Sequence, residues 1–311
     1  MENIAFIYLY ALPAVIAMSL LEGWWLGRRT PGGYDWKALA ASVADLIGRR
    51  LLAFLPISLA SPVFALAYEY RFFTIALDGM GPVLLLFVGL EFLYYWYHRT
   101  SHTVRWFWAT HAVHHSPESL NLSAAYRLGW TGRVTGATLF FTPLSLLGFA
   151  PEMVLTAFAL NLLYQFWLHA TWIPKLGWLE YVFNTPSHHR VHHARNPEYL
   201  DANYGGVLIV FDRLFGTFVE ERRELACDYG LVTPLKSYNP FVIAFHGWVA
   251  LARDLWTARS PREVAGYLFA PPGWRPDGNG LTSAELRARA GLGADRRQTH
   301  ATLTENRAAA A

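Results

Sequence analysis

The sequence predicts an all-α integral membrane protein, and its low charge and long apolar stretches are the two observations behind that prediction. Of its 311 residues, 53% are hydrophobic and 16% are charged, whereas a soluble domain carries about 25% charged residues. The chain also holds 13 tryptophans, a residue type that is enriched at membrane–water interfaces.

Four stretches contain no Asp, Glu, Lys or Arg, and each is long enough, or nearly so, to cross a hydrocarbon core of about 30 Å as a helix. They are Asn3–Leu21, Leu51–Tyr68, Val134–Pro151 and Met153–Pro174, and a fifth, Gly79–Tyr97, is interrupted only by Glu91. Five such stretches are difficult to bury as core helices of a soluble protein. We expect the first to be a retained anchor and not a signal peptide, because Glu2 and no basic residue precedes its apolar part.

Basic residues predict the orientation of these helices. The loop between the first and second stretches carries five of them, which marks a cytoplasmic loop: Arg28, Arg29, Lys37, Arg49 and Arg50. Val134–Pro174 is expected to form a helical hairpin with its turn near Gly148–Pro151. The prediction is therefore four to five transmembrane helices, with the N-terminus outside and every histidine-rich segment on the cytoplasmic face.

Charge and cysteine content exclude several function classes. The net charge of +3 is too small and too scattered to indicate a nucleic-acid partner. The single cysteine, Cys227, excludes an intramolecular disulfide framework and any multi-cysteine zinc or iron–sulfur site.

Nine of the 12 histidines fall in two short windows, "HRTSHTVRWFWATHAVHH" (98–115) and "HHRVHH" (188–193). The spacings are H-x3-H, H-x2-HH and H-x2-HH, and residues three and four apart share one face of a helix. Each motif can thus aim several imidazoles at one point. Packed imidazoles repel when protonated and are costly to bury without partners, and a bound cation removes both problems. Eight such donors exceed the needs of one ion, so the pattern predicts a dinuclear metal site.

Ligand type narrows the chemistry without selecting the metal. The Glu-x-x-His motif of soluble di-iron bundles and the H-E-x-x-H motif of zinc proteases are both absent. Imidazole suits Zn, Cu, Fe and Ni alike. The isolated His246 and His300 are expected to be ordinary polar residues.

At these residues the chain resembles the fatty acid hydroxylase/sterol desaturase superfamily, whose signature is three histidine boxes of this order beside membrane helices. The resemblance covers about residues 80–220 and is carried by "EFLYYWYHR", "HAVHHSPESLNLSAAYR", "NTPSHHRVHHARNP" and "NYGGVLIVFDRLFGT". The alkylglycerol monooxygenase-like branch is the nearest by "NTPSHHRVHH" and the run after it.

The resemblance implies a set of metal ligands. The box histidines are His98, His102, His111, His114, His115, His189, His192 and His193, and His169 in "YQFWLHA" matches an additional ligand. Some relatives carry a further histidine where this chain has Gln165, so the two ions are expected to be unequally liganded. His188 is one candidate to compensate, because it lies four residues before His192.

Four polar residues are candidates to orient the imidazoles through their second nitrogen: Glu91, Asn121, Asn203 and Asp212. A carboxylate at membrane depth needs a partner, and a histidine N–H or Arg99 is the expected neighbour of Glu91. For each of the four, a role in a cap or turn is the alternative. No catalytic residue beyond the metal ligands, and no residue of a cofactor pocket, is predicted.

The resemblance also implies the reaction. Two non-haem irons, O2 and an external electron donor would oxidise a lipid C–H bond, and for this branch the donor would be tetrahydrobiopterin. Hydroxylation is favoured, with an ether lipid as candidate substrate. A sterol desaturase or acyl-chain hydroxylase is the nearest alternative. A non-redox metal-binding or transport membrane protein is the alternative from another class, although a transporter should place its ligands near the midplane of its spans.

Four regions are expected along the chain: membrane helices in residues 1–78, a fatty acid hydroxylase-like catalytic domain in 79–240, an interfacial helix in 241–270, and a disordered tail in 271–311. Within the tail, "TSAELRARA" predicts one short helix from Ser283. The expected partners are the membrane, a lipid and a protein or small-molecule reductant. The expected location is a membrane of the bacterial inner-membrane type with the site on its cytoplasmic face.

Overall fold

The structure is a computed structural model that describes residues 2–30, 32–55 and 57–293. Within these ranges every regular element is a helix, and three isolated β-bridges are the only strand-like pairings. The all-α class predicted from the sequence is therefore confirmed.

The α-helices are α1 (Glu2–Arg29), α2 (Trp36–Leu52), α3 (Ala60–Glu69), α4 (Met80–Thr103), α5 (Arg105–His111), α6 (Thr142–Leu147), α7 (Pro151–Tyr164), α8 (Pro186–His193), α9 (Val210–Phe215), α10 (Pro240–Thr257), α11 (Pro261–Phe269) and α12 (Ser283–Arg289). The 3₁₀ helices are η1 (Leu122–Tyr126), η2 (Ala137–Phe141), η3 (Trp167–His169) and η4 (Gly177–Tyr181).

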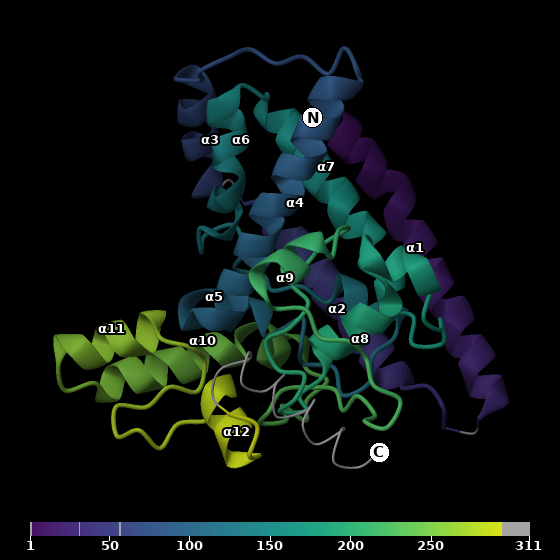
Figure 1. Ribbon diagram of the computed structural model, residues 1–311, viewed down its shortest axis with the longest axis vertical. Helices are drawn as coiled ribbons and strands as arrows, with labels where there is room; N and C mark the ends of the chain where they lie inside the picture. Colours follow the sequence, from purple (N-terminus) through teal and green to yellow (C-terminus); the bar gives the residue numbers. More distant parts are fainter. Residues whose placement is uncertain (1, 31, 56, 294–311) are drawn as a thin grey trace.

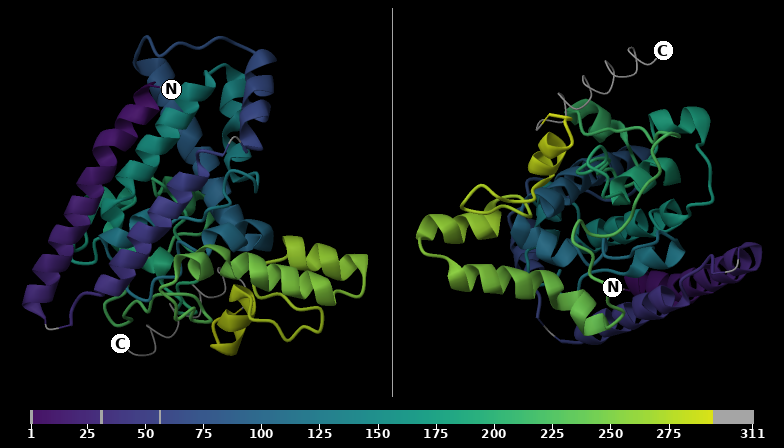
Figure 2. Two further views of the ribbon diagram at one scale, coloured as in Figure 1. Left: turned by 180° about the vertical axis from the view of Figure 1, so that it is seen from behind. Right: turned by 90° about the horizontal axis from the view of Figure 1, so that it is seen from below.

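The helices are arranged in two parts along the long axis of the molecule (Figure 1). The upper part holds α4, α7 and the upper end of α1, with the short α3 and α6 packed side by side. The lower part holds α5, α8 and α9 with their connecting loops, and the pair α10 and α11 projects from it (Figure 2). Because α4 runs from one part into the other, residues near its C-terminal end lie among the helices of the lower part.

An apolar core joins the helices of the upper part. Phe141, Phe149 and Val154 are fully buried in it, and Leu90 of α4 is 1% exposed. These residues come from α4, the η2–α6 segment and α7, so the core fixes the two halves of the Val134–Pro174 segment against α4.

Three of the five apolar stretches form shorter helices than a complete membrane crossing needs. Helix α4 is the one helix of the described residues that is long and apolar enough to cross a membrane, with a mean hydropathy of 1.3. Leu51–Tyr68 is divided, because α2 ends at Leu52 and α3 begins at Ala60. Val134–Pro151 holds only η2 and α6, and α7 ends at Tyr164. These three stretches are therefore not single helices of membrane-crossing length in the structure.

The turn between α6 and α7 lies where the sequence predicts it. Gly148 follows α6 with φ of 142°, in a region that side chains disfavour. A Cβ atom at this position would lie 2.6 Å from the carbonyl oxygen of Phe73. A glycine is therefore required for the chain to reverse here.

The C-terminal region contains more structure than a disordered tail from residue 271. Helix α10 covers the first part of residues 241–270, where an interfacial helix is predicted, and α12 begins at Ser283 with a capping box between Thr282 and Glu285. Arg287 of α12 donates a hydrogen bond to the carbonyl oxygen of Leu200 at 3.2 Å, so this helix packs on the lower part. The rest of the expected tail, 294–311 with His300, lies outside the described residues.

Phe141→Ala tests the core of the upper part. Removal of a fully buried ring should destabilise the protein by about 3–5 kcal/mol, which lowers the thermal midpoint measured in detergent. Phe72→Ala is the matched control, because Phe72 is 71% exposed. Equal loss in the two variants would contradict the assignment of the core.

Candidate metal centre

The structure brings the nine predicted ligand histidines together in two adjacent groups. A five-histidine group holds His98, His102, His111, His115 and His192, and a four-histidine group holds His114, His169, His189 and His193. Within each group, the candidate ligand atoms lie within 4.8 Å of one another. All nine side chains are buried except the half-buried His111.

Each H-x2-HH motif is divided between the two groups, which differs from the expectation that one motif points to one place. After His111 helix α5 ends and the chain turns, so that His114 joins the four-histidine group and His115 the other. On α8, His189 and His193 are four residues apart and share a group. His192 is one position off their line and points to the five-histidine group.

Backbone carbonyls hold the Nδ1 atoms of four histidines, two in each group. The pairs are His98 with Tyr204 at 2.8 Å, His192 with Ala202 at 2.9 Å, His114 with Arg127 at 3.2 Å and His169 with Gln165 at 2.9 Å. A carbonyl oxygen only accepts hydrogen bonds, so each Nδ1 carries the hydrogen. In the neutral ring Nε2 then has a free lone pair. Four of the nine imidazoles are thereby fixed in the form that binds a metal through Nε2.

Two of these lone pairs face each other. The Nε2 atoms of His114 and His169 lie 3.4 Å apart, and since both Nδ1 atoms carry the hydrogen, no hydrogen bond joins them. In the other group, Nε2 of His102 and of His192 are buried with no hydrogen-bond partner among the described residues. Buried ring nitrogens without a hydrogen-bond partner are unfavourable unless they bind a cation.

The distances between ring nitrogens suit ligands of one ion. The Nε2 atom of His111 lies 3.1 Å from that of His98 and 3.2 Å from that of His115. The Nε2 atom of His189 lies 3.1 Å from that of His169 and from that of His193. Two nitrogens bound at about 2.1 Å on perpendicular axes are about 3 Å apart. The donors present in each group therefore fit a metal ion.

Burial keeps six of these imidazoles neutral. It lowers the pKa of His114 from 6.5 to about 4, and the positive charge that His102 would carry acts in the same direction. Burial also lowers the pKa well below 6.5 in five further members of the groups: His111, His115, His189, His192 and His193. Neutral imidazole is the form that binds a metal, so the site is ready for metal ions at pH 7.

Comparison with known proteins agrees with this histidine arrangement. The family model described as fatty acid hydroxylase matches residues 83–217, which contain all nine histidines. The alkylglycerol monooxygenase of Homo sapiens is 37% identical over 269 residues, 86% of this chain and 59% of that protein. Residues 83–217 belong to the fatty acid hydroxylase family.

Further relatives place the chain on the alkylglycerol monooxygenase-like branch of this family. The alkylglycerol monooxygenase of Xenopus tropicalis is 38% identical over 263 residues, which cover 84% of this chain and 57% of the relative. The ornithine lipid hydroxylase OlsE of Rhizobium tropici is 30% identical over 167 residues, 54% of this chain and 50% of that protein. The chain thus spans less than two thirds of the length of these relatives. No solved structure matches.

Asp212 supports the histidines indirectly. Its carboxylate accepts hydrogen bonds from the backbone N–H of Tyr204 at 2.8 Å and of Gly205 at 2.7 Å, and from the hydroxyl of Thr217 at 2.7 Å. The carbonyl of the same Tyr204 holds His98. Asp212 therefore orients His98 through the backbone.

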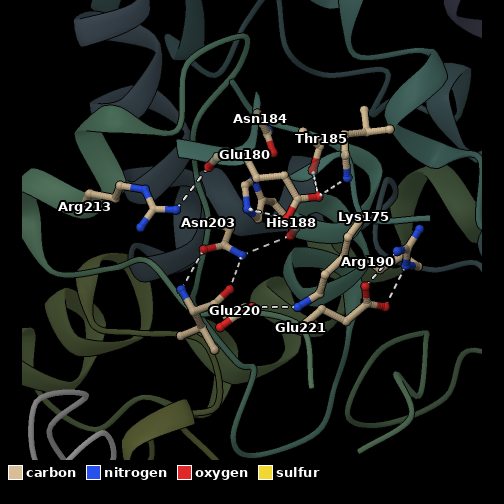
Figure 3. A network of polar contacts seen from close by, with 12 residues as sticks. Lys175, Glu180, Asn184, Thr185, His188, Arg190, Asn203, Arg213, Glu220 and Glu221 are labelled. Carbon is tan, nitrogen blue, oxygen red and sulfur yellow. Dashed lines mark hydrogen bonds and ion pairs between the residues drawn. The ribbon is translucent and has the colours of Figure 1, made fainter. Parts of the chain in front are cut away.

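His188 lies outside both groups. Its Nε2 is 3.8 Å from the Glu180 carboxylate (Figure 3), and its ring packs edge-on against Phe218. The structure thus gives no support to the idea that His188 compensates for the glutamine at 165. Asn203 donates to the carbonyl oxygens of His188 at 3.0 Å and of Val219 at 2.8 Å, so its amide holds helix α8 and not an imidazole.

Glu91 has different partners from those expected. Its carboxylate accepts hydrogen bonds from the Asn161 amide and from the backbone N–H groups of Val207 and Leu208. Among the described residues, no histidine or arginine forms a hydrogen bond or ion pair with it. The expected histidine neighbour was wrong because seven helical residues rise by about 10 Å, which separates Glu91 from His98. Arg99 donates instead to the Tyr95 hydroxyl at 3.1 Å.

Gln165 and Asn121 also lie outside both groups. The Gln165 side chain hydrogen-bonds to Tyr94 at 2.9 Å and to Asn161 at 2.6 Å. Asn121 caps η1 by accepting hydrogen bonds from the N–H and the hydroxyl of Ser123 at 3.0 and 2.7 Å. Of the four predicted orienting residues, Asn121 therefore has the alternative role of a cap.

Sequence reasoning missed two residues that support the site. The buried Arg127 donates to the hydroxyls of Ser42 and Ser116 at 3.0 and 3.3 Å and to the carbonyl of Ala38 at 2.9 Å, while its own carbonyl holds His114. Asp201 faces His102, with Oδ1 3.6 Å from Nδ1. The sequence marks these residues only by their charge and place: Arg127 ends the block "HAVHHSPESLNLSAAYR", and Asp201 follows the block "NTPSHHRVHHARNP".

Acid should destabilise the metal-free protein. The unfolded chain protonates histidine near pH 6.5, whereas folded His114 does so only near 4. Between these values the unfolded state binds more protons, so stability is highest above pH 6.5 and falls as the pH drops towards 4. Unfolding midpoints in detergent at pH 7.5 and 4.5 measure this, and equal midpoints would contradict the assigned neutral state.

Proposed function

We propose that this chain is a membrane-bound dinuclear iron enzyme that uses O2 to hydroxylate a C–H bond of a lipid, with an ether lipid as the favoured substrate. The observation that carries the proposal is the pair of opposed Nε2 lone pairs of His114 and His169, inside one of two adjacent histidine groups. Similarity to alkylglycerol monooxygenases supports the substrate class.

The choice of iron rests on the family, because imidazole ligands suit zinc equally well. The nine histidines of the two groups would hold two ions, with five ligands for one ion and four for the other. Bound iron would supply the activation of O2. Insertion of one oxygen atom into a C–H bond also forms water and consumes two electrons and two protons, so an external donor is required. Tetrahydrobiopterin is our candidate for this branch.

The protein's own residues orient the ligands and exclude water. Carbonyls of Tyr204, Ala202, Arg127 and Gln165 fix the ring positions of four histidines. Eight of the nine ligands are buried, so water has little access to the candidate ions. Such a dry site is expected for an oxidant that must react with a lipid and not with solvent.

The membrane arrangement is part of the proposal: four to five helices in the membrane, the N-terminus outside and the histidines at the cytoplasmic face. Large apolar side chains exposed in or beside the upper part support it, among them Phe54 at 84%, Phe72 at 71% and Met80 at 71%. At the lower end of α1, the guanidinium groups of Arg28 and Arg29 lie over the rings of Trp24 and Trp25, as in an interfacial anchor.

The remaining parts of the chain fit this arrangement. We assign residues 1–78 to the first membrane helices and 79–240 to the catalytic domain. In residues 241–270, α10 and α11 expose Trp256 at 91% and Phe269 at 63%, which supports a position at the membrane surface.

Metal analysis tests the dinuclear site. The native chain, purified after iron-replete expression, should contain about two irons, and His114→Ala should lose the ion of the four-histidine group and all product formation. His246→Ala is the matched control, because this half-buried histidine lies outside both groups. Less than one ion per native chain would refute the dinuclear proposal.

Lipid analysis under 18O2 tests the reaction. Cells with the native chain, but not with His192→Ala, should form a product that carries 18O. Hydroxylation beside an ether oxygen gives a hemiacetal that separates into an alcohol and a labelled aldehyde, which must be reduced at once to retain its label. A new unlabelled double bond would instead support a desaturase, and unchanged lipids would support the metal-transport class.

A further inference from the structure

One carboxylate, Glu91, is joined by hydrogen bonds to backbone segments that serve both histidine groups. Glu91 is 1% exposed, and both its oxygens are used. One accepts from the amide of Asn161, and the other accepts from the N–H groups of Val207 and Leu208 at 2.8 Å each. An ionised carboxylate accepts such bonds strongly in a buried site.

The first branch leads to the four-histidine group. Asn161 accepts a hydrogen bond from the Gln165 amide at 2.6 Å, and Gln165 in turn accepts one from the Tyr94 hydroxyl at 2.9 Å. These bonds hold Gln165 where α7 ends, and the backbone carbonyl of Gln165 accepts from Nδ1 of His169 at 2.9 Å. Glu91 therefore acts on His169 through Asn161 and Gln165.

The second branch leads to the five-histidine group. Val207 and Leu208 end a loop that runs from Ala202, and the carbonyls of Ala202 and Tyr204 in this loop hold His192 and His98. Gly206, in the same loop, packs directly on Asn161, and a Cβ atom there would overlap its amide. Glu91 thus holds the end of this loop at Val207 and Leu208, and Asp212 holds its middle at Tyr204 and Gly205.

We propose that Glu91 is a positioning residue that keeps the carbonyl acceptors of both histidine groups in place and so couples the two metal sites. This inference rests on the proposed function, since it takes the two groups as metal sites. Glu91 contacts neither histidine group, so its effect passes through the Asn161–Gln165 branch and through the loop 202–208. Loss of a residue that orients metal ligands typically weakens metal binding by about 10–100-fold.

Cobalt titration of the purified full-length chain in detergent tests the proposal, because the Co²⁺ absorption spectrum reports the coordination geometry. Glu91→Ala should weaken both Co²⁺ sites by about 10–100-fold and alter both spectra. Asn161→Ala breaks the first branch and leaves the bonds of Glu91 to Val207 and Leu208 in place, although Gly206 loses the side chain on which it packs. It should therefore weaken the four-histidine group more than the five-histidine group. A His114→Ala background isolates the five-histidine group, so that Glu91→Ala in that background reports on the loop branch alone.

Two conservative variants separate positioning from simple loss of folding. Glu91→Gln keeps an oxygen for the two backbone amides, and the Asn161 and Gln165 amides can rotate to match it. The Co²⁺ affinity of both sites should therefore stay within about 3-fold of the native value. Glu91→Asp keeps the charge but is shorter by one methylene, and should weaken both sites. These two variants keep the test decisive if Glu91→Ala does not insert. Glu152→Ala, at an exposed carboxylate on α7, is the control and should behave as native.

The possible outcomes separate the two proposals. A native chain that binds two Co²⁺ ions, together with a Glu91→Ala or Glu91→Asp variant that also binds both with native affinity and spectrum, would overturn the role of Glu91 alone. Weakening of one site only would also overturn the coupling. A native chain that binds less than one Co²⁺ ion would overturn the proposed function itself, and the role of Glu91 with it.

Discussion

Four hydrogen bonds from histidine Nδ1 to backbone carbonyls are the constraint on which the candidate site depends. They fix which ring nitrogen carries the hydrogen in His98, His192, His114 and His169. With Nδ1 occupied, the Nε2 lone pairs point into the two groups. Those of His114 and His169 face each other, and that of His192 has no hydrogen-bond partner among the described residues. The resulting arrangement is unfavourable as an empty polar core and favourable around cations.

The buried charges of this protein support the backbone behind the histidines. Arg127 binds α2 through Ala38 and Ser42 while its carbonyl holds His114, and Asp212 binds the loop whose carbonyl holds His98. A hydrogen bond to a charged group contributes about 1.5–3 kcal/mol, more than a neutral one. The charged side chains therefore position carbonyl oxygens, and the carbonyls position the rings.

This construction explains why the two groups are close and yet unequal. Helix α8 supplies His192 to one group and His189 and His193 to the other, and the turn after α5 divides His114 from His115 in the same way. Each window thus contributes to both groups, so neither group can be displaced without the other. Gln165 stands where some relatives carry a further histidine. Its side chain is linked to Glu91 through Asn161, and its carbonyl holds His169.

His169 was implied by the family resemblance, whereas the sequence by itself determined the helical class, the position of the α6–α7 turn and the other eight histidines of the two groups. These features are local, because they depend on apolar content, on a glycine at a required φ angle and on helical spacing. Only the tertiary structure decided how the histidines divide, that His188 stays outside both groups, and that Glu91 binds a loop more than 100 residues away in the chain. It also decided that Leu51–Tyr68 and Val134–Pro151 are broken into short helices. Such partners and breaks depend on which distant backbone groups meet, and residue spacing carries no information about that.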